Sequence, residues 1–321
     1  MPELEPAAGT PRISVIAPAL NEGATLEELF HTIRDVLEPI DPGFEVVVVD
    51  DGSTDGSFEI LRRLHAQDAR LRALRFNVNY GKAAALAAGS AMVRGEIIFT
   101  IDADLQDDPL EIPRLLEKLA EGYDLVSGWK RERSDSRLRA WASRLFNTVV
   151  ARATRIPLHD FNCGFKCYRR AVLEQVDVYG EMHRFVPVLA SWRGFRSAEV
   201  PVRHHPRRAG RSRYGAERWL RGLLDFITVM FFTRYGKRPS HLFGKLGLLA
   251  AAAGAACLLG GALHGLTHRA AARGGTLAVL LLGALLLLAG IQLLATGLVA
   301  EMLTYHHRKD EPGYRVHDRI G

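Results

Sequence analysis

The chain has 321 residues, of which 48% are hydrophobic and 24% are charged, and its formal net charge is +6 at pH 7. This length is enough for more than one domain with a sizeable core, and three cysteines are too few for a disulfide framework. The basic excess does not require a nucleic-acid partner, and we expect none, because anionic lipids beside apolar segments attract the same Lys and Arg residues.

The composition divides the chain into unlike parts. Residues 1–10 are acidic with no apolar core, which predicts a disordered tail and no signal peptide. Residues up to about 235 mix charged and apolar side chains, as a soluble domain does. Residues 246–263 and 276–300 contain no charged residue at all.

Short apolar runs alternate with segments of helical periodicity over residues 11–215, which predicts an α/β fold with a doubly wound, mostly parallel sheet. Strands are expected at 12–17, 44–49, 70–75, 96–101, 123–127, 162–168 and 197–202. Helices are expected at 24–37, 57–66, 82–93, 109–120, 137–153, 169–175 and 183–192.

The last third of the chain predicts membrane attachment. Residues 217–233 carry charges only in their first half and several aromatic residues, which is typical of an interfacial helix. Two transmembrane helices are expected at about 242–264 and 276–302. The apolar stretch of 276–300 is 25 residues long, and at about 1.5 Å per residue it crosses a hydrocarbon core of about 30 Å.

Basic residues flank both predicted spans, whereas the connection between them holds only two arginines. The positive-inside rule therefore places both termini in the cytoplasm. Small residues in the first span permit close helix packing, for example between copies of the chain, or they simply fill the membrane. They are Gly244, Gly247, Gly254, Gly260 and Gly261.

Two predicted strands end in pairs of carboxylates. Asp102 and Asp104 follow the apolar run that ends at Ile101, and Asp50 and Asp51 follow the run of four valines before them. Ligands of open α/β sheets bind at the carboxyl ends of strands, and carboxylates one residue apart suit a hard divalent cation that shares its ligands with phosphates. The sequence therefore predicts a metal and nucleotide site at this edge.

Neither a phosphate-cradling GxxxxGK[ST] loop nor a GxGxxG fingerprint is present. A metal held by Asp102 and Asp104 would neutralise a diphosphate instead. Asp107 or Asp108, just before Pro109, can cap the following helix, which leaves the first pair for the metal. His204 and His205 lack the spacing of metal ligands, so a solvated role is expected for both.

Four motifs, at residues 15–22, 49–55, 79–83 and 102–106, resemble the ordered motifs of family 2 glycosyltransferases, which have the GT-A fold. Residues 160–170, 183–187 and 207–214, followed by two spans, resemble the polyprenyl-phosphate group, which includes dolichol-phosphate mannose synthases and bactoprenol glucosyltransferases. The resemblance implies a cytoplasmic GT-A catalytic domain. The expected parts are the domain at 11–215, an interfacial region at 216–238, a transmembrane hairpin at 239–304 and a cytoplasmic tail at 305–321.

The resemblance also implies roles for single residues. The residues implied for nucleotide-sugar binding are Pro18, Asn21, Glu22, Asp51, Lys82, Asp102, Arg207, Ser212 and Arg213, with Asp51 at the base or ribose and Lys82 near the base. The metal ligands would be Asp102, Asp104 and Gln106. The acceptor phosphate would be bound by Lys130, Arg139 and Ser143, and the catalytic residues would be Asp102, Asp104, Arg139 and Ser143. Asp50 is expected to be structural.

The expected reaction is an inverting transfer of one hexose from a nucleotide-diphosphate sugar to a polyprenyl phosphate, undecaprenyl or dolichyl. A phosphate monoester with a second pKa of about 6 is already a nucleophile near pH 7, so no strong general base is required. Whole-chain likeness favours UDP-glucose over GDP-mannose as donor, and both Mg²⁺ and Mn²⁺ accept carboxylate oxygens. The resemblance further implies an integral protein of the cytoplasmic membrane and association between copies.

Two alternatives stay open from the sequence. A processive polysaccharide synthase of the same fold would carry a QxxRW motif and more spans, whereas the QxxR found here, at residues 67–70, lies in the wrong place. A non-catalytic membrane adaptor with a decayed transferase domain would be expected to lose the paired aspartates or the acceptor arginine, and this chain keeps both.

Overall fold

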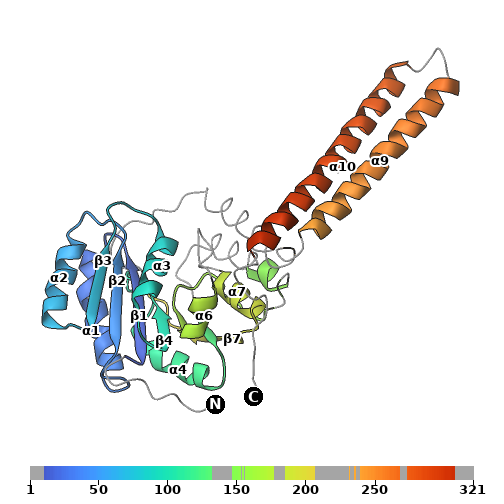
Figure 1. Cartoon of the computed structure of the whole chain (residues 1–321). Helices are drawn as coiled ribbons and strands as arrows, with labels where there is room; N and C mark the ends of the chain where they lie inside the picture. Colours follow the sequence, from blue (N-terminus) through green and yellow to red (C-terminus); the bar gives the residue numbers. More distant parts are fainter. Residues whose placement is uncertain are drawn as a thin grey trace. The chain divides into compact units, whose positions relative to one another are not determined.

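The computed structural model describes residues 11–131, 147–152, 154, 156–176, 185–206, 231, 235, 239–267 and 273–307. The chain forms two compact units, Met1–Val229 and Met230–Gly321. Figure 1 shows a sheet with helices packed on it in the first unit and a pair of long helices in the second.

Within the described residues, the first unit contains a seven-stranded sheet in the order β3-β2-β1-β4-β6-β5-β7. The strands are β1 (Ile13–Ala19), β2 (Glu45–Asp50), β3 (Leu71–Arg75), β4 (Ile97–Thr100), β5 (Leu125–Lys130), β6 (Lys166–Arg169) and β7 (Ser197–Val202). Only β6 runs antiparallel to its neighbours. The predicted doubly wound, mostly parallel sheet is therefore confirmed.

The helices of this unit follow the predicted periodicity closely. They are α1 (Gly23–Leu37), α2 (Ser57–Gln67), α3 (Lys82–Met92), α4 (Ile112–Ala120), α6 (Arg170–Gln175) and α7 (Val186–Trp192). The helix expected at 109–120 begins with a 3-10 turn, Pro109–Glu111, where the Asp108 carboxylate accepts a hydrogen bond from the backbone N–H of Leu110. Of the helix expected at 137–153, residues 147–152 are described and are helical.

The central strands are buried on both faces, as parallel strands between helices must be. Alternate valines of β2 face opposite ways: Val46 and Val48 pack in one core cluster, and Val47 and Val49 pack in another. The first cluster contains side chains of α1, α2 and α4, and the second contains side chains of α3. This sandwich fixes the carboxyl ends of β1, β2 and β4 against one another.

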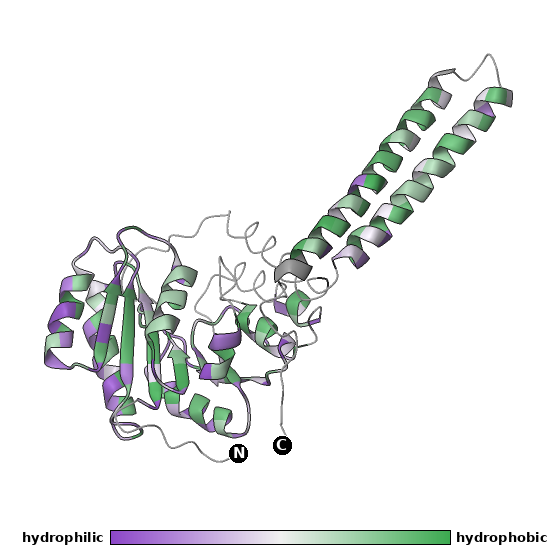
Figure 2. Cartoon of the chain, in the orientation of Figure 1, coloured by the Kyte–Doolittle hydropathy of each residue, from purple (hydrophilic) through white to green (hydrophobic). Residues whose placement is uncertain are grey.

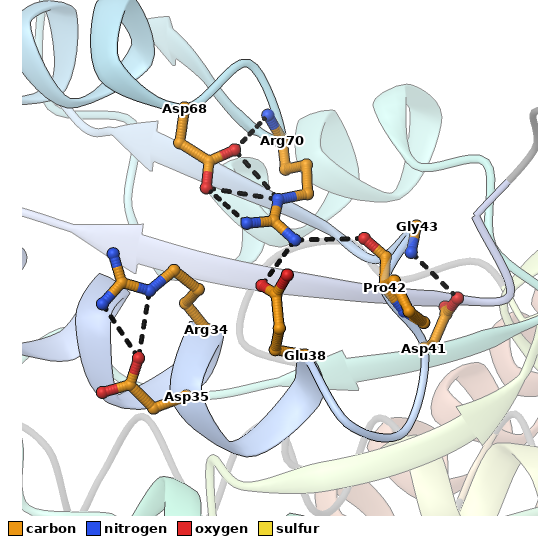
Figure 3. A network of polar contacts seen from close by, with 8 residues as sticks. All are labelled: Arg34, Asp35, Glu38, Asp41, Pro42, Gly43, Asp68 and Arg70. Carbon is orange, nitrogen blue, oxygen red and sulfur yellow. Dashed lines mark hydrogen bonds and ion pairs between the residues drawn. The ribbon is translucent and has the colours of Figure 1, made fainter.

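A network of charged residues lies at the amino ends of β2 and β3, opposite to the carboxyl ends of the strands (Figure 3). The Arg70 guanidinium lies 2.7 Å from a carboxylate oxygen of Asp68 and 2.7 Å from one of Glu38, and it also donates to the carbonyl oxygen of Pro42. The same group lies 4.5 Å from the centre of the Phe44 ring. These contacts hold the end of α1 against the amino ends of the strands, so this cluster is structural.

The second unit contains two long helices, α9 (Ser240–Thr267) and α10 (Arg273–His307). Both are long and apolar enough to cross a membrane, and little of either helix is buried within the structure. Figure 2 shows apolar residues along most of both helices. The ranges predicted for the two spans, 242–264 and 276–302, lie inside these helices.

Glycines line the contact between α9 and α10 at intervals of seven residues, the period of a left-handed helix pair. The facing sets are Gly247, Gly254 and Gly261 on α9, and Gly283, Gly290 and Gly297 on α10. A Cβ on Gly254 would lie 2.6 Å from the backbone nitrogen of Leu287, whereas one on Gly244 or Gly260 would meet nothing within 4 Å. Three of the five small residues of the first span therefore serve packing within the chain.

Candidate active site

The site lies beside β1, where the strand order of the sheet reverses. β2 and β3 lie on one side of β1, and β4 lies on the other. Because β1, β2 and β4 are parallel, their carboxyl ends meet at one edge. This is the switch point at which open α/β sheets bind ligands, and the loops after these three strands carry the residues that the sequence singled out.

The loop after β1 is fastened to the loop after β2 through Asn21. The side-chain oxygen of Asn21 accepts a hydrogen bond from the backbone N–H of Thr54 at 2.8 Å, and the backbone N–H of Asn21 donates to Ser53 Oγ at 2.8 Å. Asn21 has a positive φ of 55°, a region that Asn enters more readily than most residues. Pro18 is half-buried and Glu22 is nearly buried, so these predicted pocket residues form a fixed wall.

Asp51 organises the loop that precedes α3. Its two carboxylate oxygens accept hydrogen bonds from the backbone N–H groups of Tyr80 (2.7 Å) and Gly81 (2.9 Å). Asp50 is fully buried; it accepts from the N–H of Ser53 at 2.9 Å and lies 3.5 Å from Arg75. This geometry fits the structural role expected for Asp50, and it shows that Asp51 shapes the loop before α3, whereas its predicted contact with a base or ribose remains a prediction.

Lys82, the first residue of α3, forms an ion pair with Asp102. The side chains are 27% and 29% exposed, respectively, so the pair remains open to a ligand. The structure thus brings Lys82 to the first carboxylate of the paired aspartates. Its predicted contact with a base remains a prediction.

The turn that carries Asp102, Asp104 and Gln106 is tightly bent. Leu105 has a φ of 56°, which is unusual for a bulky residue and marks backbone strain of the kind found at functional sites. The N–H of Gln106 donates to a carboxylate oxygen of Asp104 at 3.2 Å. A Cβ on Gly164 would lie 2.7 Å from Asp102 Oδ2, so a glycine is needed behind this carboxylate.

The predicted metal ligands fit a hard cation. Within the described part of the chain, no three His, Cys, Asp or Glu side chains converge on one point. The turn instead supplies two carboxylates and the amide oxygen of Gln106. An all-oxygen set of this size suits Mg²⁺ or Mn²⁺, whose remaining ligands are waters and substrate phosphates.

A buried charged cluster lies next to this turn, and the sequence analysis missed it. Lys130 Nζ lies 2.8 Å from Asp107 Oδ1, and His204 Nδ1 lies 3.7 Å from the same oxygen. The expectation that His204 is solvated is wrong, because its side chain is only 9% exposed. Two adjacent histidines in a sequence do not predict that His204 is buried, because the residue it faces, Asp107, lies almost a hundred residues earlier.

Several predicted site residues lie outside the described part of the chain: Arg139, Ser143, Arg207, Ser212 and Arg213. Their roles remain predictions. Lys130 is described, and its ammonium group is engaged by Asp107.

Comparison with known proteins agrees with this geometry. Residues 14–177 match the family described as "Glycosyl transferase family 2". The chain is 36% identical to dodecaprenyl-phosphate galacturonate synthase of Rhizobium johnstonii, over 95% of this chain and 91% of that protein. It is 39% identical to undecaprenyl-phosphate 4-deoxy-4-formamido-L-arabinose transferase of Pseudomonas aeruginosa, over 91% of this chain and 84% of that protein.

A solved structure shows the same fold. Glucosyl-3-phosphoglycerate synthase of Mycobacterium tuberculosis, in complex with Mn²⁺, UDP and glucosyl-3-phosphoglycerate, matches 70% of this chain and 80% of its own, with 23% identity and a TM-score of 0.52. The conserved fold, the paired aspartates at the switch point and the two extended sequence matches agree on one assignment: the chain belongs to glycosyl transferase family 2 and is a glycosyltransferase.

Proposed function

We propose that this enzyme transfers a single sugar from a UDP-sugar to a polyprenyl phosphate at the cytoplasmic face of a membrane. The observation that carries the proposal is the extent of the sequence match. The relatives named as polyprenyl-phosphate sugar transferases align over 91–95% of this chain, which includes the apolar hairpin as well as the catalytic unit. A lipid acceptor would explain why a catalytic unit and an apolar hairpin occur in one chain.

The chemistry asks the protein to position two anions. The acceptor phosphate is largely dianionic near pH 7, by its second pKa of about 6, so one of its oxygens attacks the anomeric carbon without a general base. The bond from that carbon to the donor β-phosphate oxygen breaks, and the nucleoside diphosphate leaves with the electron pair. Attack opposite the leaving group inverts the anomeric centre.

Residues of the switch point bind the donor in this scheme. The loops held by Asn21 and Asp51 enclose the nucleoside, with Lys82 near its base, and Asp102 stands at the diphosphate. A divalent cation bound by Asp102, Asp104 and Gln106 would neutralise the charge that develops on the leaving diphosphate. Arg139 and Ser143 are the proposed ligands of the acceptor phosphate.

The donor sugar is the finer part of the proposal. The sequence favours UDP-glucose over GDP-mannose, while the names of the two relatives add a galacturonate and a 4-deoxy-4-formamido-L-arabinose donor. UDP in the structural neighbour supports uracil as the base. We take a UDP-sugar as the donor class, and a panel of these donors identifies the sugar.

The proposed topology places the catalytic unit and both termini in the cytoplasm. Its support is the lysines and arginines that flank the two helices in the sequence. A green fluorescent protein fused after Gly321 is expected to fluoresce in bacterial cells, and alkaline phosphatase fused at the same point is expected to be inactive. The reverse pattern would overturn this topology.

The decisive assay is transfer of radiolabelled sugar in detergent. Purified protein, undecaprenyl phosphate and Mn²⁺ or Mg²⁺ would be incubated separately with four donors. These are UDP-glucose, GDP-mannose, and the UDP forms of galacturonate and of 4-deoxy-4-formamido-L-arabinose. Asp104→Ala removes a proposed metal ligand. Asp35→Ala is the matched control, because Asp35 is exposed on α1 and its ion pair is with its neighbour Arg34.

Label in the lipid phase with one donor, lost in Asp104→Ala and kept in Asp35→Ala, is the expected result. Label in a water-soluble polymer would replace the proposal with a processive synthase. Unchanged function in Asp104→Ala would favour the non-catalytic adaptor, and donor binding without turnover on any lipid phosphate would favour a nucleotide-sensing binding module.

A further inference from the structure

The cluster around Asp107 joins three segments that are far apart in the sequence. Asp107 follows the turn of the proposed metal ligands, Lys130 ends β5, and His204 follows β7. Asp107 is fully buried, and the Lys130 side chain is 13% exposed. A buried charge requires a partner, because removing it from water is costly.

The ion pair is strong enough to keep both groups charged. Burial alone would lower the pKa of Lys130, but attraction to Asp107 outweighs burial and raises it above its usual value. Lys130 therefore remains an ammonium group directed at Asp107. The imidazole of His204, 3.7 Å from the same carboxylate oxygen, lies too far for a hydrogen bond and adds a polar wall to the cluster.

Backbone contacts connect the cluster around Asp107 to the turn that carries Asp102, Asp104 and Gln106. Residues 107 and 204 form an antiparallel bridge, and the N–H of His205 donates to the carbonyl oxygen of Gln106 at 2.8 Å. The Gln106 side-chain nitrogen lies 3.4 Å from the carbonyl oxygen of His205. Gln106 thus contacts His205 through both its backbone and its side chain.

We propose that Lys130 is a positioning residue: through Asp107, with His204 packed beside them, it fixes the turn that presents Asp104 and Gln106 to the donor side of the site. Lys130 would then act on metal and nucleotide binding and would not itself bind the acceptor phosphate. This inference rests on the proposed function only in taking that turn as the metal site.

The test separates the two roles by what they change. Lys130→Met removes the charge at similar length and leaves Asp107 buried without its partner, so the dissociation constant of Mn²⁺, measured by calorimetry with and without UDP, is expected to rise about tenfold, the lower end for loss of a supporting residue. Asp107→Asn with Lys130→Met removes the whole pair, and because the two residues act as one unit the constant is expected to rise about as far as in Lys130→Met and no further. Lys130→Arg keeps the pair and is expected to behave as wild type.

Lys118→Met is the matched control, because Lys118 pairs with Glu121, which is more than half exposed. It is expected to leave Mn²⁺ binding unchanged. Thermal unfolding of each variant is measured alongside. If Lys130→Met does not fold, the double variant and Lys130→Arg still decide, since the proposal requires weakened Mn²⁺ binding in the first and wild-type Mn²⁺ binding in the second.

Two results would overturn the inference. One is a Lys130→Met protein with normal Mn²⁺ affinity and a raised KM for polyprenyl phosphate alone, which is the behaviour of an acceptor ligand. The other is a folded double variant that binds Mn²⁺ as well as wild type does, because the turn would then not need the pair. A wild-type protein that does not bind Mn²⁺ overturns the inference together with its metal site, whereas one that binds Mn²⁺ but transfers no sugar overturns only the proposed function.

Discussion

Substitution of Gly164 tests whether the turn that carries Asp102, Asp104 and Gln106 binds a metal, and it disturbs little else. It lies in the turn before β6, directly behind the Asp102 carboxylate. A Cβ at this position would stand 2.7 Å from Oδ2 and 2.9 Å from both Cγ and Oδ1 of Asp102. The three atoms nearest to this Cβ all belong to Asp102, a proposed metal ligand, so Gly164→Ala pushes first on that side chain.

The size of the effect follows from the distances. Ordinary contact begins at 3.4 Å, so an approach of 2.7 Å requires a shift of about 0.7 Å. The Asp102 carboxylate is the end of a short, rotatable and partly exposed side chain, so it can yield with little cost to folding. Metal ligands tolerate only about 0.2 Å, and misplacement by about 1 Å can lower a rate about a hundredfold.

We therefore expect Gly164→Ala to lower kcat/KM by about 30-fold while the unfolding temperature changes little. The measurements are Mn²⁺ titration, sugar transfer and thermal unfolding on the same preparation. Gly43→Ala is the control, because the nearest atom to a Cβ at Gly43 lies at 3.5 Å, an ordinary contact, at the amino end of β2.

Wild-type Mn²⁺ affinity and activity in Gly164→Ala would refute the reasoning, because Asp102 would then have no need of its observed position. Loss of activity accompanied by a large drop in unfolding temperature would instead show that the turn before β6 supports folding and not the ligand.

Three further predictions follow from other parts of the chain. Gly254→Leu is expected to destabilise the helix pair in detergent by about 1–3 kcal/mol through overpacking, whereas Gly260→Leu, which points into open space, should unfold at the wild-type denaturant concentration. Hydrogen bonds, among them one from the Arg94 N–H, outweigh burial and hold the pKa of Glu45 below its ordinary value of 4.5; its contribution to stability is therefore present above that pH and is lost as pH falls through the lowered pKa. Urea unfolding at neutral and acidic pH should show this loss in wild type but less in Glu45→Gln. Asp51→Asn replaces one acceptor with a donor that faces a backbone N–H, costing about 2 kcal/mol, so steady-state kinetics should give a raised donor KM; an unchanged KM would contradict the role of this loop.

The sequence by itself determined the parts of the fold that depend on local pattern. The run of valines before Asp50 and the run before Asp102 specify buried strands with carboxylates at their ends, because side-chain alternation and burial are written residue by residue. Asp107 or Asp108 before Pro109 likewise predicted a cap, since a cap depends on neighbours in the chain, and the structure assigns it to Asp108. Length and the absence of charge predicted both apolar helices.

Tertiary structure alone decided which distant residues meet. The sequence does not show that β6 enters antiparallel between β4 and β5, which brings Gly164 against Asp102. Nor does it pair Lys130 and His204 with Asp107, or assign Gly254 to the contact within the hairpin while Gly260 faces outward. Such contacts arise from strand order and helix rotation, which are set by the packing of the whole core and leave no mark at any one position.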